Sequence, residues 1–187
     1  MRRLAWTCAL VVVAMLIGCG GGGGGATPRE TFNKLKNALT DKKFDDVWSL
    51  LSTDSQKYYE DKAAQIAKKA GEVMKESEPQ SRIALGNQAK IMEITVEKMK
   101  KLDGKTLVGA LLTMAAKDGK DVWGTISRTK YGSEEISEDG RTAKVFVECD
   151  GVVQETKPIL LVLEDEQWKV DLMTMLPEEK MTGASKP

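Results

Sequence analysis

The fold is decided by residues 142–149, which read Thr-Ala-Lys-Val-Phe-Val-Glu-Cys and run into Asp150-Gly151. Every second side chain of this stretch is apolar, and that period of two is typical of a half-buried strand. The dipeptide Asp-Gly favours a two-residue hairpin, because both of its positions accept a positive φ. The stretch therefore predicts a strand and the turn that opens an antiparallel hairpin. The expected buried face carries Ala143, Val145, Val147 and Cys149.

Further strands are expected on both sides of this hairpin. Residues 159–163 are apolar on both faces, as expected of a central strand that is entered through Pro158. After an acidic turn at residues 164–166, apolar and polar side chains alternate again, with Trp168 facing the core. Upstream, residues 125–131 are polar and weakly alternating, which predicts an edge strand. The last third of the chain thus predicts an antiparallel sheet.

Before Trp123 the apolar spacing is that of helices. Residues 27–30 (Thr-Pro-Arg-Glu) form a capping box with proline at the first helical position, and they open a helix that is expected to end near Lys42. A short second helix is expected from Phe44, and a second capping box at residues 53–56 opens a long third one. The remaining apolar stripes predict helices over residues 87–99 and 107–114.

Helices first and strands last predict an α+β domain, in which N-terminal helices pack on a C-terminal antiparallel curved sheet. We expect this single domain to span residues 27–176 and to end in a polar tail over residues 177–187.

The N-terminus has the pattern of a signal peptide. Two arginines precede an apolar run of 14 residues from Leu4 to Ile17, which is too short to span a bilayer core of about 30 Å comfortably. The run ends in Leu16-Ile17-Gly18-Cys19, which resembles the lipobox of bacterial lipoproteins. That resemblance implies that residues 1–18 are removed and that Cys19 carries the lipid. An ordinary secretory signal with a chance cysteine, and an uncleaved anchor, are the alternatives.

Six glycines, residues 20–25, follow the lipobox cysteine. A glycine run behaves as a flexible coil, so residues 19–26 are expected to be a lipidated tether that holds the body roughly 15 Å off the lipid. A phosphate-binding loop would need a preceding strand and a following Lys-Ser or Lys-Thr, and neither is present. In lipoproteins, Gly20 in place of aspartate implies sorting to the periplasmic face of an outer membrane, if the cell has one.

Composition excludes several classes of function. Without Arg2 and Arg3 the chain keeps 26 basic against 28 acidic side chains, so it has no basic excess with which to bind nucleic acid. It contains no histidine, which removes Ser-His-Asp and Cys-His catalysis and histidine-bound zinc. Apart from Cys8 and Cys19, Cys149 is the one cysteine, and we expect it to be a small buried hydrophobe. No cofactor and no metal site are predicted.

Parts of the chain resemble lipoproteins with a nuclear-transport-factor-2-like domain. The resemblance lies in residues 28–32 (Pro-Arg-Glu-Thr-Phe), in residues 44–51 (Phe-Asp-Asp-Val-Trp-Ser-Leu-Leu), and in the strands around residues 140–145 and 166–171. It covers about 70 of the 169 residues that follow the signal peptide. It implies a cone with a cavity between the helices and a concave sheet. The chain departs from that pattern over residues 55–118, where it carries a longer helical segment than the family needs.

Three kinds of function remain open. A proton-transfer enzyme would need a carboxylate, Asp46 or Asp171, beside a tyrosine, although Asp171 is expected on the solvent side of its strand. The candidate tyrosines are Tyr58, Tyr59 and Tyr131. A binding module would use aromatic residues of a pocket, for which the candidates are Trp48, Tyr58, Trp123 and Trp168, or these residues simply fill space. An assembly protein would pair its long helices with another chain.

We favour a non-enzymatic binding or accessory lipoprotein of the cell envelope. Its expected partners are the membrane, through the lipid on Cys19, and either a small ligand or an envelope protein. The domain is expected to be a monomer or a homodimer.

Overall fold

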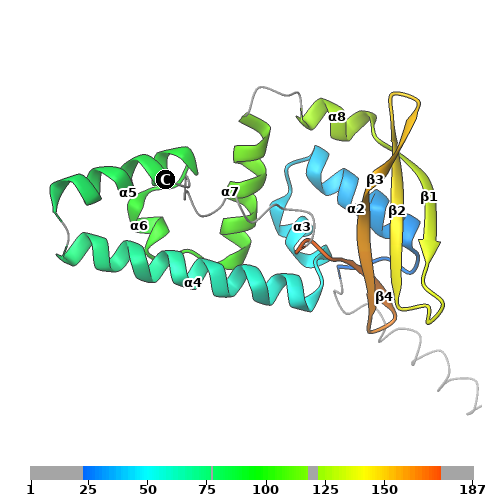
Figure 1. Ribbon diagram of the computed structural model, residues 1–187, viewed down its shortest axis with the longest axis horizontal. Coiled ribbons are helices and arrows are strands. Elements are labelled where there is room, and N and C mark those ends of the chain that lie inside the picture. The colour runs from blue at the N-terminus through cyan, green and yellow to red at the C-terminus, as the bar shows by residue number, and fades with distance from the viewer. Residues whose placement is uncertain (1–22, 77, 118–121, 174–187) are drawn as a thin grey trace, which may run out of the picture.

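The computed structural model describes residues 23–76, 78–117 and 122–173, and these form helices followed by a sheet (Figure 1). The predicted signal peptide, the lipobox with Cys19 and the predicted tail at residues 177–187 lie outside the described residues. The helices are α2 (Pro28–Thr40), α3 (Phe44–Leu50), α4 (Thr53–Glu76), α5 (Pro79–Ile91), α6 (Val96–Met99), α7 (Gly104–Lys117) and α8 (Val122–Arg128). The strands are β1 (Lys130–Ile136), β2 (Thr142–Cys149), β3 (Val152–Glu164) and β4 (Gln167–Val170). The predicted α+β class, with helices before an antiparallel sheet, is confirmed.

The four strands form one antiparallel sheet in the order β1-β2-β3-β4, so each strand pairs with its neighbour in sequence. Asp150 and Gly151, with φ of 51° and 83°, join β2 to β3 as the Asp-Gly signal predicts. Asp165 and Glu166 make the corresponding turn before β4, also with positive φ, although neither is a glycine. The central position of the strand that contains residues 159–163 is confirmed.

One face of the sheet packs on α2, and the side chains between them form one part of the hydrophobic core. The capping box predicted at residues 27–30 is present, since the Thr27 hydroxyl accepts a hydrogen bond from the Glu30 backbone N–H at 3.2 Å. Phe32 and Leu35 of α2 are buried in the same cluster as the inward side chains of the sheet. Those inward side chains are Ala143, Val145, Leu161, Trp168 and Val170.

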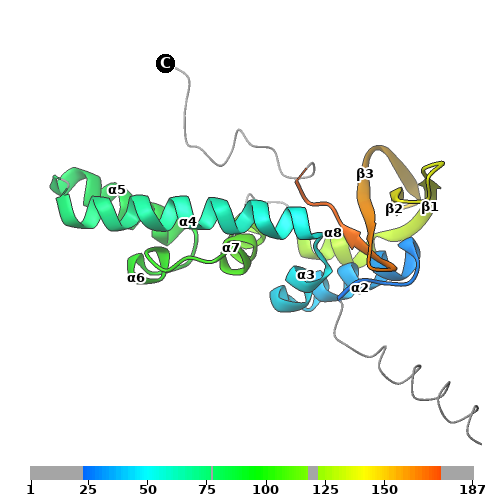
Figure 2. The same ribbon diagram turned by 90° about the horizontal axis from the view of Figure 1, so that it is seen from below.

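The other helices form a lobe that extends away from the sheet. In Figures 1 and 2, α4 runs from the sheet to the far end of the molecule, where α5 and α6 lie beside it. Helix α7 stands between this end and the sheet, and it contacts both α4 and α3. Leu107 and Val108 of α7 are each 1% exposed, so α7 is the centre of the lobe.

The edge strand predicted over residues 125–131 is wrong for most of its length. Helix α8 occupies residues 122–128, and β1 begins only at Lys130. The apolar signal of this stretch is Trp123 and Ile126, which are spaced by three residues and half-buried on a helix that contacts α2. The Ser127 hydroxyl donates to a carbonyl oxygen three residues back, and the Thr129 hydroxyl donates to one four residues back. Serine and threonine make such bonds in helices, so their presence does not by itself indicate a strand.

The single helix predicted over residues 87–99 is also wrong. Helix α5 begins earlier, with Pro79 in its first turn, and passes through Gly86. It ends before Glu93, whose φ is 55°, and Thr95 then caps α6 by accepting a hydrogen bond from the Lys98 N–H at 3.1 Å. A side-chain cap therefore starts a new helix where the apolar spacing alone continues the old one.

Two smaller expectations need correction. Cys149 is half-buried rather than buried, because it ends β2 beside the hairpin turn. Asp171 is not simply on the solvent side of a strand, since it lies just beyond β4 and accepts hydrogen bonds from the Ser55 hydroxyl at 3.2 Å and the Met173 N–H at 3.1 Å. In the part of the chain that the structure describes, no helix has the length and apolar character needed to cross a membrane.

Candidate functional site

The four aromatic residues proposed for a pocket do not meet in one. Trp168 is 6% exposed and belongs to the core between the sheet and α2. Trp48, on α3, is half-buried and packs against the start of α7, where a Cβ on Gly104 would come within 2.7 Å of its ring. These two tryptophans fill space in the fold.

Tyr58 and Trp123 lie on two further parts of the molecule. Tyr58, on α4, meets Tyr59 edge to face at 5.1 Å, and the Lys62 ammonium lies 5.3 Å from the centre of its ring. Trp123, on α8, faces Phe44 at 6.4 Å between ring centres. Sequence reasoning grouped these residues by type, and the fold separates them.

The structure does bring together one of the carboxylate–tyrosine pairs. The Ser55 hydroxyl donates to Asp171, and Tyr59 lies one turn further along α4. Burial raises the pKa of Tyr59 well above its usual value, and the nearby Tyr58 and the charge of Asp171 add to that rise. The Tyr59 side chain is 0% exposed, and its hydroxyl makes no hydrogen bond to the described residues. A substrate could not reach this hydroxyl without opening the core.

The other candidate carboxylate and tyrosine are apart from this pair. Asp46 is exposed on α3. Tyr131, on β1, donates to Glu134 of the same strand, and burial followed by this hydrogen bond raises the pKa of Tyr131 to about 12. Within the described ranges no group of three or more cysteine, aspartate or glutamate side chains gathers as a metal site would require.

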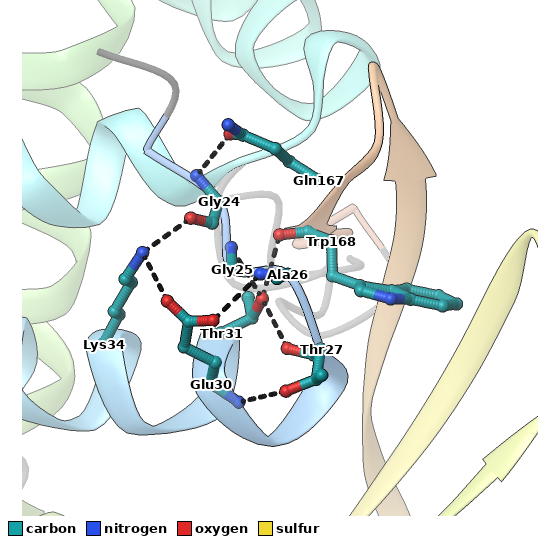
Figure 3. Close-up of polar contacts among 9 residues, drawn as sticks. All are labelled: Gly24, Gly25, Ala26, Thr27, Glu30, Thr31, Lys34, Gln167 and Trp168. Carbon is teal, nitrogen blue, oxygen red and sulfur yellow. Dashed lines mark hydrogen bonds and ion pairs between the residues drawn. The ribbon is translucent and has the colours of Figure 1, made fainter. Parts of the chain in front are cut away.

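A feature that sequence analysis missed is the docking of residues 23–26 onto the sheet, and we call these four residues the glycine strap (Figure 3). The Trp168 N–H donates to the Gly25 carbonyl at 2.8 Å, and the Gly25 N–H lies 3.3 Å from the Trp168 carbonyl. The Gly24 N–H donates to the Gln167 side chain at 3.2 Å. This half of the predicted coil is therefore held as a one-residue bridge along the outer edge of β4.

The strap is also held by α2, whose first two turns contribute three side chains. The Thr31 hydroxyl accepts a hydrogen bond from the Gly25 N–H at 3.0 Å and lies 3.0 Å from the Trp168 carbonyl, to which it donates. The Lys34 ammonium donates to the Gly24 carbonyl at 2.8 Å. The Glu30 carboxylate accepts from the Ala26 N–H at 3.0 Å (Figure 3).

Glu30 also pairs with Lys34 at 2.9 Å, and the two residues lie one helical turn apart. The hydrogen bond from Lys34, followed by the one from the Ala26 backbone, lowers the pKa of the Glu30 carboxyl. A capping-box glutamate usually reaches back to the N–H of the capping residue, and here it reaches one residue further, to the strap.

The strap requires glycine because of how closely it approaches its neighbours. A Cβ on Gly23 would lie 2.2 Å from the Ser49 carbonyl oxygen, one on Gly24 would lie 2.6 Å from the Trp168 carbonyl oxygen, and one on Gly25 would lie 2.6 Å from the Thr31 nitrogen. Real Cβ atoms do not approach backbone atoms to these distances. The glycine run therefore supplies close packing as well as chain flexibility.

Two of the hollows on the described surface bear on a binding function. The first, which we call the strap hollow, lies beside Gly23 and has a volume of about 330 Å³. Its charged and polar lining consists of Lys34, Asn37, Asp41, Lys43, Asp46 and Ser49.

The second is a groove of about 620 Å³ between α4 and α5, which we call the α4–α5 groove. Its lining is apolar at Ile66, Val73 and Leu85, and α4 adds Lys62 and Lys69 at the same groove. These three apolar residues and the two lysines give the groove a mixed apolar and cationic character.

Comparisons of the chain with protein-family models, with curated proteins and with solved structures found no match. The fold and the site therefore define a class in structural terms: an α+β protein whose N-terminal glycine segment is bonded to the edge of its C-terminal sheet.

Proposed function

We propose that this chain is a membrane-anchored envelope lipoprotein that acts as a non-catalytic binding or accessory module. The observation that carries the proposal is the continuity between the lipobox and the fold. Only Gly20, Gly21 and Gly22 separate Cys19 from Gly23, the first residue of the strap. A lipid on Cys19 would thus be joined through three residues to a segment that is bonded to β4 and α2.

We also propose that the domain is nuclear-transport-factor-2-like. The short sequence resemblance at both ends supports this, as does the packing of α2 on one face of an antiparallel sheet. The space in which that family's cavity would lie holds Phe32, Leu35 and Val145, none of which is more than 6% exposed. Ligand binding between the helices and the sheet is therefore disfavoured in this chain.

The α4–α5 groove is the better candidate for the binding surface. It lies on the helical lobe, at the end of the molecule away from the strap (Figures 1 and 2). Groove residues Lys62 and Val73 on α4 are eleven residues apart, which corresponds to about 16 Å of helix, or three turns. An amphipathic helix with an acidic flank fits an apolar groove of this length that carries Lys62 and Lys69. We therefore propose a segment of an envelope protein as the partner.

A proton-transfer enzyme is the weaker proposal. The charge of Asp171 acts on Tyr59, but the Tyr59 hydroxyl is sealed in the core, and burial is the main cause of its raised pKa. A proton donor of this kind acts at an accessible position with a pKa near the working pH.

The anchor is tested by mass spectrometry of the protein purified from membranes. We expect the wild-type N-terminal peptide to begin at Cys19 with a diacylglyceryl group. Cys19→Ser should lose the lipid and leave the membrane fraction or remain unprocessed, whereas the control Cys149→Ser should keep the lipid. An unmodified mature N-terminus in the wild type would contradict the proposal.

The groove is tested by a photo-crosslinking residue placed at Ala84, on its α5 side, and by a control at Ala64, which is exposed elsewhere on α4. A discrete envelope-protein adduct is expected at Ala84 and not at Ala64. Ile66→Glu should remove the adduct, because it places a carboxylate in the apolar part of the groove. Identical products at both positions would count against a groove-bound partner, and turnover of a test substrate that disappears on Asp171→Asn would overturn the non-catalytic proposal.

A further inference from the structure

The docked strap shortens the link between Cys19 and the folded body. From Cys19 to Gly23 the chain takes four Cα steps, which reach at most about 14 Å when fully extended. As a coil the same link averages roughly 10–12 Å. If the whole segment to Thr27 were a coil, its eight steps would average roughly 14–17 Å and could extend to about 29 Å. Docking of the strap therefore roughly halves the reach of the anchor.

This distance is comparable to the thickness of the headgroup layer. The polar region of a bilayer adds about 5–7 Å to each side of the hydrocarbon core. A lipidated Cys19 sits at the edge of that core, because its acyl chains are buried there. Gly23 then stands within, or only a few ångströms above, the headgroups. The link therefore keeps the surface around Gly23 close to the lipid.

The strap hollow occupies that surface, and its lining carries both signs of charge. Lys34 and Lys43 supply two ammonium groups, Asp41 and Asp46 supply two carboxylates, and Asn37 adds an amide. Lys43 and Asp41 already pair at 3.0 Å, with half or more of each side chain exposed. Both groups thus keep contact with solvent, and each can take a further ionic partner from the membrane side.

We propose that the strap hollow rests on the membrane and binds zwitterionic phospholipid headgroups. The inference rests on the proposed lipid anchor at Cys19. The phosphate of such a headgroup matches Lys43, and its ammonium matches Asp41 and Asp46. An anionic headgroup such as phosphatidylglycerol carries no ammonium group, so it would offer the Asp41 and Asp46 carboxylates no cationic partner and would be repelled by them. The balanced charge of the lining therefore selects a zwitterionic over an anionic lipid surface.

The test uses full-length protein purified with its lipid and reconstituted into vesicles of phosphatidylcholine and phosphatidylethanolamine. In a Cys149→Ser background, a fluorophore is attached at Asn37→Cys in the hollow or at Gln80→Cys on α5, at the far end of the molecule. Spin-labelled headgroups quench a fluorophore that they touch. We expect several-fold stronger quenching at position 37 than at position 80. Equal quenching at the two positions would overturn the proposal.

Two matched changes separate the tether from the headgroup contact. A Gly-Ser insert of about twenty residues between Gly22 and Gly23 raises the mean anchor length to roughly 24–29 Å and should reduce the quenching at position 37. Lys43→Gln with Asp46→Asn should also reduce it, whereas Lys57→Gln with Asp61→Asn, an exposed ion pair on α4, should not. The proposal fails if both charge pairs behave alike, or if the insert changes nothing.

Varying the lipid composition of the vesicles tests which headgroup the hollow binds. Quenching at position 37 should persist without anionic lipid and should not increase when phosphatidylglycerol is added. A requirement for anionic lipid would overturn the zwitterionic assignment. Mass spectrometry of each sample shows whether Cys19 is acylated, so a missing anchor, which would contradict the proposed function, is distinguishable from an acylated protein whose hollow does not touch lipid.

Discussion

Replacing Thr31 by valine tests how firmly the glycine strap is held. Valine has nearly the same shape as threonine, so the change leaves no cavity and removes only the hydroxyl. That hydroxyl is fully buried, accepts the Gly25 N–H at 3.0 Å and donates to the Trp168 carbonyl at 3.0 Å. The Gly25 N–H and the Trp168 carbonyl keep each other as weaker partners at 3.3 Å.

A hydrogen bond within a protein contributes about 0.5–1.5 kcal/mol net, and the Thr31 hydroxyl makes two to the strap and β4, so we expect Thr31→Val to lower the free energy of unfolding by about 1–3 kcal/mol. For a chain of this size that corresponds to a fall in Tm of roughly 2–12 °C. Chemical denaturation of the purified protein, with residues 23–26 present, measures the first quantity, and exchange of the Gly25 amide hydrogen reports the strap itself. The control is Thr125→Val, at an exposed position on α8, which should stay within about 0.5 kcal/mol of the wild type. A Thr31→Val protein with unchanged stability and unchanged Gly25 exchange would show that the strap is not held as argued.

Three further outcomes are expected. Trp168→Ala should lower the free energy of unfolding by roughly 3–5 kcal/mol, as for other large aromatic deletions in cores, and an unchanged Tm would contradict the buried position of the ring. Tyr59→Phe removes a buried hydroxyl that has no partner among the described residues, so it should raise stability by roughly 1 kcal/mol, and a clear loss on denaturation would reveal a partner. The pKa of Glu30 is lowered in the folded state, so its contribution is present above the unfolded value of 4.5 and is lost as the pH falls through the lower folded value. Exchange of the Ala26 amide should therefore quicken relative to other amides at the acidic end of this window in the wild type, but not in Glu30→Gln.

The strands were predictable where local chemistry and burial agree. Residues 142–149 alternate because one face of β2 is buried, and Asp150-Gly151 accepts the positive φ that the turn requires. The turn at Asp165 and Glu166 has the same backbone shape without a glycine. Its sequence carries no such signal, and the pairing of β3 with β4 is what holds it.

The predictions for the helical part of the chain were wrong where two local preferences compete. The spacing of Met92, Val96 and Met99 suits one continuous helix, but the cap at Thr95 begins a separate one. The stretch that begins at Trp123 has too few apolar residues for their spacing to distinguish a helix from a strand. Its packing against α2 favours the helix. In both cases a contact or cap, rather than the average pattern, sets the outcome.

The candidate site was predictable only in part. Burial of Trp168 followed from its alternation and is confirmed. The strap was not predictable, because a glycine run has no side chains through which to signal its partner. The bridge between Gly25 and Trp168 joins residues 143 positions apart, and the threonine that locks it, Thr31, has no feature in the sequence that distinguishes it from a surface threonine.

The same bridge occupies backbone groups at the β4 edge of the sheet. An edge strand offers unpaired backbone groups to any other strand it meets, which is a route to polymerisation. On β4 the outward N–H and carbonyl of Trp168 are taken by Gly25, and the carbonyl of Val170 accepts the Ser52 N–H at 2.9 Å. If lipid anchors crowd many copies onto one membrane, an open β4 edge would be exposed to its neighbours at high local concentration. The glycine segment that follows the proposed lipid anchor would concentrate the protein on the membrane, and the same segment covers the edge of β4.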